Sequence, residues 1–244
     1  SSVQVTITGS NDIAIITGTA TGSVVEAGGL ANASLGTPSV AGVLSVTDAD
    51  TGQSSFATPA SLAGTYGTFT FNKASGVWSY TLDNSKAATQ ALTTGQEVHD
   101  TLSVTSLDGT ASQTIDVTVT GANDAPTIGT PQITVSVSEE GLSGGIIDTT
   151  GNPDSTDATG SLGNLVFNDI DSTKLSVSLT APTETLTSGG QSIIWTSSTD
   201  SSGNALLVGH IGSATGAAVL TVTCDTAGHY TVSLEKPIDH AYQG

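Results

Sequence analysis

The chain has 244 residues, of which 36% are hydrophobic and only 4% aromatic. Its 22 Asp and Glu residues against 4 Lys and Arg residues give a formal net charge of −18 at pH 7. This charge excludes nucleic acid and anionic membranes as favourable partners, because both require a basic surface. Most carboxylates have no basic side chain to pair with, so they face water or bind metal cations.

The cysteine content and the apolar runs narrow the class of protein further. Cys224 is the only cysteine, so an intrachain disulfide and a thiolate metal cluster are both excluded. It lies in a strand-like run, which predicts a small buried side chain. No run of 18 apolar residues is present, so we expect no insertion into a membrane. We further expect a monomer.

Runs in which apolar and polar residues alternate recur about every ten residues, each bounded by turn residues. They span residues 2–9, 42–48, 67–72, 76–83, 100–106 and 113–121. Residues 85–96 have room for one helical turn and no more. This rhythm predicts an all-β fold of Ig-like antiparallel sandwiches. Within 76–83, Trp78 and Tyr80 share one face of the expected strand and are predicted to point into the core.

An internal repeat organises the sequence. "TGSND" and "TGAND" place Asn11–Asp12 and Asn123–Asp124 112 positions apart. After each pair come, in the same order, a strand ending at a Glu, an Asp-x-Asp and a Gly-x-aromatic strand. We therefore predict two tandem Ig-like domains, residues 1–123 and residues 124–244.

The second copy differs from the first in two respects. It carries additional residues, including 186–212, which predict one or two inserted hairpins. It also has no counterpart of the strands expected at 100–106 and 113–121. A sandwich without these strands exposes its core and edges. We therefore expect the second domain to be incomplete or split, with its last strands beyond Gly244, either directly or after an inserted ligand-binding domain.

Acidic residues fall where the expected strands end, and this predicts Ca²⁺ sites. Tandem domains swivel at short linkers, and Ca²⁺ stiffens such a joint by gathering six to eight oxygens. The junction set comprises Glu26 and Asp83 from the first domain, Asn123 and Asp124 from the linker, and Asp169 and Asp171 from the second domain. At the opposite end of the first domain we expect a further set of Asn11, Asp12, Asp48, Asp50 and Asp108. Glu139 or Glu140 is expected to face whatever follows the second domain.

These motifs indicate metal sites only in combination. An isolated Asp-x-Asp is often only a turn. The ordered set of Glu, Asp-x-Asp and Asn-Asp, present twice, favours metal sites over turns alone.

The same motifs resemble the calcium motifs of cadherin repeats. Residues 66–126 more closely resemble the VCBS-type bacterial Ig-like repeats of giant RTX adhesins, which leave the cell by type I secretion. The second copy resembles the distal repeat of such adhesins, which an inserted sugar- or peptide-binding domain can split. The sequence departs from the cadherin pattern at Ser85, where that pattern has Glu, and it lacks the "GGxGxD" nonapeptide of RTX proteins. The resemblance implies Ca²⁺ as cofactor, a role in cell adhesion and biofilms, and a place on the surface of a Gram-negative bacterium.

These observations predict a structural extender that holds a ligand-binding domain away from the cell, with neighbouring repeats of the same polypeptide as partners. The alternative is a carbohydrate- or peptide-binding module that uses the extra hairpin, with Trp195 either in the core or as one wall of a sugar platform. An enzyme is not expected. The sequence has no GxSxG, HExxH, P-loop or GxGxxG motif, and its four histidines fall at unrelated places.

Overall fold

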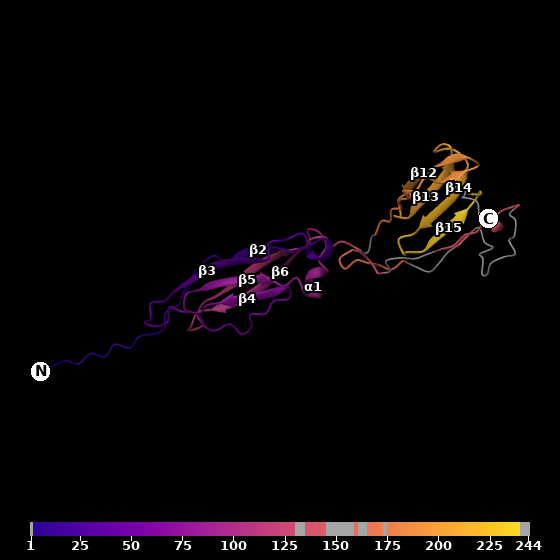
Figure 1. Cartoon of the computed structure of the whole chain (residues 1–244). Coiled ribbons are helices and arrows are strands. Elements are labelled where there is room, and N and C mark those ends of the chain that lie inside the picture. Colours follow the sequence, from indigo (N-terminus) through magenta and orange to yellow (C-terminus); the bar gives the residue numbers. More distant parts are fainter. Residues whose placement is uncertain (1, 130–134, 145–158, 161–164, 173–174, 240–244) are drawn as a thin grey trace. The chain divides into compact units, whose positions relative to one another are not determined.

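The computed structural model describes residues 2–129, 135–144, 159–160, 165–172 and 175–239. The chain divides into two compact units, unit 1 (Ser1–Ala125) and unit 2 (Pro126–Gly244), and each is described by itself (Figure 1). Nearly all regular structure in the described residues is strand, which confirms the predicted all-β class. No helix in these residues is long and apolar enough to cross a membrane.

Unit 1 is built from two sheets. The first has the order β1 (Ile15–Gly18), β3 (Ser39–Thr47), β5 (Val77–Leu82) and β4 (Gly67–Phe71), with antiparallel neighbours throughout. The second has the order β2 (Thr21–Val25), β7 (Ser112–Thr120) and β6 (Glu97–Thr105). In this sheet β7 is parallel to β2 and antiparallel to β6. A 3-10 turn, η1 (Leu30–Asn32), and one helical turn, α1 (Ala87–Gln90), lie in the connections.

The strands β1 and β2 form one continuous stretch that passes from the first sheet to the second at Gly18. This residue has a φ of +119°, which disfavours side chains with a Cβ. A Cβ at this position would also overlap the carbonyl oxygen of Val43 on β3. Glycine at this position therefore allows the bend by which one stretch of chain contributes a strand to each sheet.

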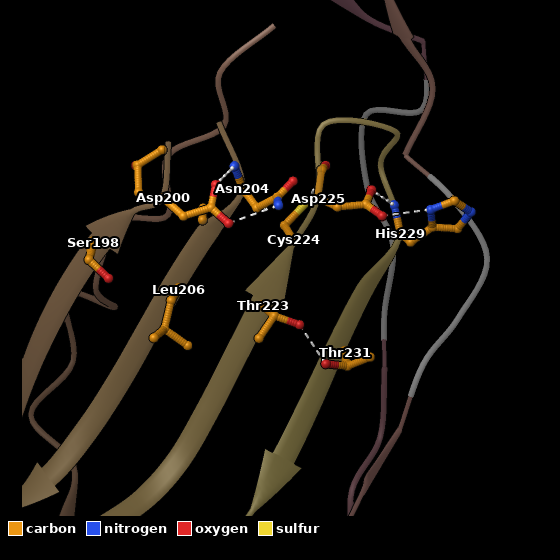
Figure 2. Close-up of a pocket in the computed structure, with 11 residues that line it drawn as sticks. Ser198, Asp200, Asn204, Leu206, Thr223, Cys224, Asp225, His229 and Thr231 are labelled. Carbon is orange, nitrogen blue, oxygen red and sulfur yellow. Dashed lines mark hydrogen bonds and ion pairs between the residues drawn. The ribbon is translucent and has the colours of Figure 1, made fainter. Parts of the chain in front are cut away.

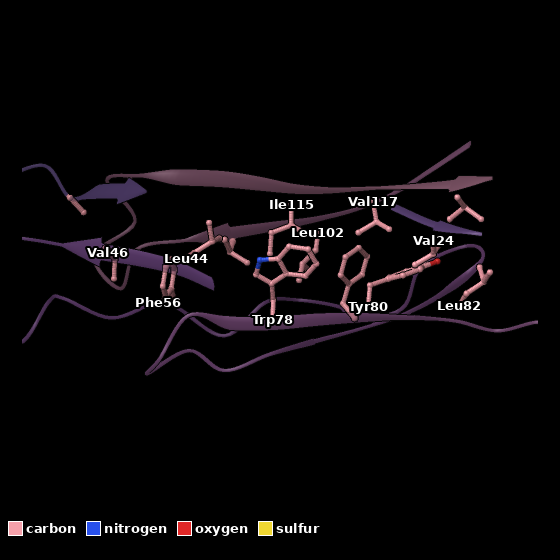
Figure 3. Close-up of a cluster of buried hydrophobic side chains, with 14 of the residues drawn as sticks. Val24, Leu44, Val46, Phe56, Trp78, Tyr80, Leu82, Leu102, Ile115 and Val117 are labelled. Carbon is pink, nitrogen blue, oxygen red and sulfur yellow. The ribbon is translucent and has the colours of Figure 1, made fainter. Parts of the chain in front are cut away.

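The core of unit 1 lies between the two sheets (Figure 3). Trp78 and Tyr80 project from β5 toward Ile115 and Val117 of β7, and all four side chains are fully buried. This confirms the inward direction predicted for the two aromatic residues. The indole Nε1 of Trp78 donates to the backbone oxygen of Thr19 at 2.8 Å, so the buried ring leaves no unsatisfied donor there.

Most of the strand predictions for unit 1 hold, and one does not. The alternating runs from 42 to 121 form β3 to β7, and the single helical turn predicted within 85–96 is α1. The run at 2–9 forms no strand in the described structure. Its apolar residues Val3, Val5 and Ile7 are 88%, 75% and 89% exposed. A strand needs neighbouring strands that supply hydrogen bonds and a layer that covers its apolar face. In the described part of unit 1 the sheet positions are taken by β1 to β7, so residues 2–9 have neither.

Unit 2 is organised around one larger sheet. Its order is β11 (Thr187–Ser188), β12 (Gln191–Thr199), β13 (Ala205–Ile211), β14 (Ala218–Cys224), β15 (Tyr230–Leu234) and β9 (Thr159–Gly160). A separate pair joins β8 (Thr127–Ile128) and β10 (Phe167–Asn168), and η2 (Glu139–Gly141) is a 3-10 turn. The inserted hairpins predicted at 186–212 are β11 to β13, which continue the sheet.

One face of this sheet is apolar. Ile193, Leu207 and Leu234 are buried on it. Cys224 is 1% exposed and carries a free thiol, as the sequence predicts. Trp195 has the same strand parity as Ile193, and its ring lies over Gly209 on the neighbouring strand. Trp195 is therefore part of the packed face.

Candidate metal sites at the ends of unit 1

Strand direction determines which acidic residues meet at the two ends of unit 1. β1 begins where β3 ends, because Ile15 pairs with Thr47. Residues before β1 and after β3 therefore lie at one end. β2 and β7 are parallel and finish together at the other end, with Val25 opposite Thr120. Loops that are far apart in the sequence are thus brought to common ends.

At the first end, hydrogen bonds connect all five residues predicted there. We call this group the Asn11 cluster: Asn11, Asp12, Asp48, Asp50 and Asp108. The side-chain amide of Asn11 donates to Oδ2 of Asp108 at 2.9 Å. The backbone N–H of Asp12 donates to Oδ2 of Asp50 at 2.8 Å, and that of Asp50 donates to Oδ1 of Asp48 at 2.8 Å. Three separate segments therefore converge on one acidic surface.

Two carboxylates of the Asn11 cluster have distinct environments. The pKa of Asp108 lies well below its ordinary value, chiefly because the Ser106 hydroxyl donates to it, with further bonds from Thr110 and Asn11. Oδ2 of Asp48 is buried and accepts no hydrogen bond within the described structure. A buried acceptor of this kind normally has a bonding partner, and a bound cation can be that partner.

The donor set of the Asn11 cluster fits calcium in kind. It offers carboxylate, amide and backbone oxygens and no sulfur or imidazole, which matches the ligands of a hard cation. In the described part of the chain, however, no group of three or more His, Cys, Asp or Glu side chains is arranged to hold a metal ion. The carboxylates of Asp50 and Asp108 are instead engaged by the backbone of Asp12 and the amide of Asn11.

At the opposite end, three of the predicted junction residues lie together. Glu26 follows β2 and is only 1% exposed. Its Oε2 accepts the backbone N–H of Ala122 at 3.2 Å. The backbone N–H of Gly29 donates to the carbonyl oxygen of Asn123 at 2.6 Å, and Gly29 also forms a bridge with Asp124. The linker Asn-Asp is therefore held against the segment that follows Glu26.

Asp83 lies at the same end of unit 1. β5 and β1 are both antiparallel to β3, and β2 continues β1, so β5 and β2 run in the same direction and end on the same side. Its hydrogen bonds are local. The backbone N–H and the hydroxyl of Ser85 donate to Oδ1 of Asp83 at 2.9 and 2.6 Å. The pKa of Asp83 is lowered, first by the Ser85 hydroxyl. Where the cadherin pattern has a Glu, this chain therefore has a serine that caps the neighbouring carboxylate.

Sequence reasoning missed Gln90 as a neighbour of Glu26. The side-chain amide of Gln90 donates to Oε1 of Glu26 at 2.9 Å, and the amide of Asn32 donates to Oε1 of Gln90 at 3.2 Å. Gln90 is placed by α1 and Asn32 by η1. The predicted helical turn at 85–96 was the one signal that a side chain from this loop reaches the end of the sandwich.

In unit 2, Asp169 and Asp171 directly follow β10. Asn168 pairs with Thr127, so these residues lie beside the first described strand of unit 2. Oδ1 of Asp169 accepts the backbone N–H groups of Asp171 and Ser172 at 3.2 and 3.0 Å, and Asp171 is 8% exposed. The Asp-x-Asp thus forms a compact turn next to the start of the unit.

Glu139 and Glu140 both lie in η2, where Ser138 caps the turn by accepting the backbone N–H of Glu140 at 3.2 Å. Oε1 of Glu139 accepts the backbone N–H of Ile238 at 2.8 Å. Glu139 is therefore held against a residue near the C-terminal end of the described chain.

A second missed residue, Asp100, is a buried structural acceptor. It is 3% exposed and accepts the backbone N–H groups of Thr65, Tyr66 and Gly67 at 2.7, 2.9 and 3.1 Å. The hydroxyl of Tyr80 donates to it at 2.6 Å, and burial followed by this bond raises the pKa of Tyr80. Asp100 shares strand parity with buried Leu102, a pattern that could have marked it as buried.

A groove of about 500 Å³ lies on unit 2, at the turn β12–β13 and the turn β14–β15 (Figure 2). Asp200 and Asn204 come from the first turn, and Asp225 and His229 come from the second. Nδ1 of His229 lies 2.9 Å from Oδ2 of Asp225, and this bond is the main cause of the lowered pKa of Asp225. Among the described residues, the His229 imidazole is the one aromatic ring that lines the groove. Trp195 lies on the opposite face of the sheet.

Comparison with known families bears on unit 1. Residues 11–121 match the family model of the bacterial cadherin-like domain. The match begins at the Asn-Asp pair and ends with β7, and it leaves unit 2 unmatched. No curated protein matches the chain.

Among solved structures, the chain is similar to the Protocadherin GammaB4 extracellular domain, with 14% sequence identity and a TM-score of 0.32. The alignment covers 86% of this chain and 34% of that one, so this chain spans about a third of its length. A likeness this distant adds nothing to the assignment of unit 1.

The family match supports a coarse role. Cadherin-like domains are extracellular modules with adhesive or structural roles, they are typically not enzymes, and they generally bind calcium. Two histidines of the described residues make local contacts. His99 pairs with Asp116 at 2.7 Å on the surface of unit 1, and His210 lies 3.1 Å from Thr196 within unit 2.

Proposed function

We propose that this chain is an extender of a bacterial cell-surface adhesin, made rigid by Ca²⁺ at the ends of its domains. Its task is to hold a ligand-binding domain away from the cell. The observation that carries the proposal is the Asn11 cluster, in which three distant segments place oxygen donors at the end of a cadherin-like sandwich. A purely solubilising acidic surface has no reason to gather its carboxylates in this way.

Two groups of residues would hold the ions. At one end of unit 1 they are Asn11, Asp12, Asp48, Asp50 and Asp108. At the other end they are Glu26, Asp83, Asn123 and Asp124. In unit 2 the candidate ligands are Asp169 and Asp171. Bound calcium supplies positive charge that offsets the mutual repulsion of these carboxylates.

The net charge of −18 makes this offset important. Without cations, self-repulsion destabilises a compact acidic chain and leaves the linker free to swivel. Extracellular calcium modules bind their ion with a dissociation constant of about 10⁻⁴–10⁻³ M, so their sites fill outside the cell and stay vacant in the cytosol. A chain that is loose inside and rigid outside suits passage through a secretion channel. The resemblance to RTX adhesins supports type I secretion, a Gram-negative cell surface and a role in biofilms.

Small-angle X-ray scattering of the intact chain tests the extender role. With about 10 mM CaCl₂ we expect a narrow distribution of dimensions, and with EDTA we expect a broader one. Magnesium at the same concentration is the control, because Mg²⁺ keeps its waters and does not gather many protein oxygens. Indistinguishable scattering in calcium and in EDTA would contradict calcium-dependent rigidity.

A second candidate function is carbohydrate or peptide binding by unit 2. The groove between the turns at Asp200 and Asp225 favours it, because convergent polar side chains are what a ligand site requires. The position of Trp195 on the packed face removes the aromatic platform that sugar binding commonly uses. A glycan array probed with the intact chain decides between the two functions, since one clean ligand class would place the binding role ahead of the extender role.

A further inference from the structure

The segment that begins at Glu26 holds the chain where it leaves β7. The backbone N–H of Glu26 donates to the carbonyl oxygen of Thr120 at 2.9 Å, and its Oε2 accepts the backbone N–H of Ala122 at 3.2 Å. The backbone N–H of Gly29 then donates to the carbonyl oxygen of Asn123 at 2.6 Å. The parallel pairing of β2 with β7 is therefore continued past the ends of both strands.

The other oxygen of the Glu26 carboxylate is held by a pair of side-chain amides. Nε2 of Gln90 donates to Oε1 of Glu26 at 2.9 Å and to Oδ1 of Asn32 at 3.3 Å. Oε1 of Gln90 accepts from Nδ2 of Asn32 at 3.2 Å. We call Asn32, Gln90 and Glu26 the Gln90 relay. The orientation of the Gln90 amide is fixed within it, because the reversed amide would set an oxygen against the carboxylate.

Asn32 enters the relay from a strained segment of backbone. Ala31 and Asn32 are the two residues other than glycine that have a positive φ in the described structure, at 52° and 57°. This conformation disfavours residues with a Cβ and persists where the surrounding contacts hold it. The reciprocal amide pair with Gln90 is such a contact. Asn32 is therefore held in an unfavourable conformation in which its side chain meets Gln90.

Gln90 is itself placed by a support that reaches the core. The ammonium of Lys86, at the start of α1, donates to two carbonyl oxygens of loop 64–67 at 2.8 and 3.1 Å. The buried hydroxyl of Thr89 donates to a further carbonyl oxygen of this loop at 3.2 Å. Backbone N–H groups of the same loop donate to the buried carboxylate of Asp100. The helical turn that carries Gln90 therefore rests on a loop that is fixed from the core.

We propose that the Gln90 relay positions the Glu26 carboxylate against the chain that follows β7, and so fixes the direction in which the chain leaves unit 1. Gln90 and Asn32 are positioning residues that act through Glu26. If the carboxylate were not held, the N–H of Ala122 would lose its acceptor and the exit from β7 would open locally. The proposal deepens the extender role and rests on it for its purpose, but its readout does not depend on calcium.

Amide hydrogen exchange of the intact chain, measured in EDTA, tests the relay. Gln90→Met preserves the length of the side chain and removes the donor. We expect the amides of Ala122 and Gly29 to exchange at least about tenfold faster in this variant, while the amides of β7 keep their rates. Gln90→Lys retains a donor for the Glu26 carboxylate and should preserve most of the protection.

Two further variants separate the relay from a general effect of substitution. Asn32→Gly removes the second amide and suits the positive φ of this position, so it should give a smaller acceleration than Gln90→Met. Gln113→Met is the matched control, because the amide of Gln113 donates to the backbone oxygen of the next residue on β7. It should leave the exchange of Ala122 and Gly29 unchanged.

Two results would overturn the proposal. One is unchanged exchange of Ala122 and Gly29 in the Gln90→Met chain. The other is an acceleration that reaches the amides of β7 by the same factor, because Gln90 would then only add to the stability of unit 1. Faster exchange of Ala122 in Gln90→Met, in a chain whose dimensions do not respond to calcium, would support the relay and contradict calcium-dependent rigidity alone.

Discussion

The backbone N–H of Asp12 donates to the Asp50 carboxylate at 2.8 Å, although 38 positions separate the two residues in the sequence. This bond ties the segment before the first strand to the Asp-x-Asp turn after β3. It places a residue that precedes the first strand against an acidic turn at the same end of the sandwich.

Asp50→Asn should weaken calcium binding at the Asn11 cluster by about tenfold or more, because calcium affinity depends on the number of charged ligands. Isothermal titration calorimetry of the intact chain measures the affinity and the number of sites. Asp116→Asn removes the same charge from the middle of β7, where the carboxylate pairs with His99, and should leave calcium binding unchanged. Equal effects of the two substitutions would show that only net charge matters.

Asp100→Ala should destabilise unit 1 by about 3–5 kcal/mol, because it leaves buried backbone N–H groups and the Tyr80 hydroxyl without their acceptor. Urea unfolding, followed by tryptophan fluorescence from Trp78, measures the loss. Asp116→Ala is the surface control and should change the free energy of unfolding by about 0.5 kcal/mol or less. A loss below about 1 kcal/mol for Asp100→Ala would show that loop 64–67 relaxes to find water.

Gly18→Ala should cost about 1–3 kcal/mol, since the residue has a positive φ and its Cβ would meet the backbone of Val43. Gly9→Ala is the matched control, because an added Cβ there meets no atom within 4 Å. Thermal unfolding of both variants provides the comparison. Equal midpoints would mean that the passage between the sheets does not need glycine.

His229→Phe should raise the pKa of Asp225, because the His229 side chain is the main cause of its lowered value. A lowered folded pKa contributes stability above the unfolded value of about 3.9, and that contribution disappears as the pH falls through the folded pKa. The carboxyl carbon shift of Asp225 in an NMR titration measures the change. Asp200 is the internal control: its pKa is lowered mainly by Asn204, and it should not move.

The fold class and the grouping of residues in the Asn11 cluster could be predicted from the sequence for one physical reason. Side chains alternate between the two faces of a strand, and successive strands reverse direction, so short segments of sequence already indicate which residues share a face or an end. The alternation of side chains along the strand was enough to predict that Trp78 and Tyr80 lie in the core. The reversal of direction from strand to strand placed Asp12 and Asp50 at the same end of unit 1, and the structure joins them by a hydrogen bond.

What the sequence did not predict depends on contacts between distant loops. Gln90 reaches Glu26 across 64 positions, and only the positions of both loops determine this contact. Asp100 was missed because an acidic residue is normally taken as exposed, although its parity matched that of Leu102. The strand predicted from the alternation at 2–9 does not form in the described structure, because alternation carries no information on whether a neighbouring strand is available to pair with it.

The most direct test of the central claim is thermal unfolding of the intact chain in EDTA and in about 10 mM CaCl₂. Each site with a dissociation constant of about 10⁻⁴–10⁻³ M should stabilise the folded state by about 1.4–2.7 kcal/mol. The midpoint of unfolding should therefore rise by at least about 5 °C, and Asp50→Asn should reduce the rise. An identical midpoint in EDTA and in calcium would contradict a calcium-stiffened extender.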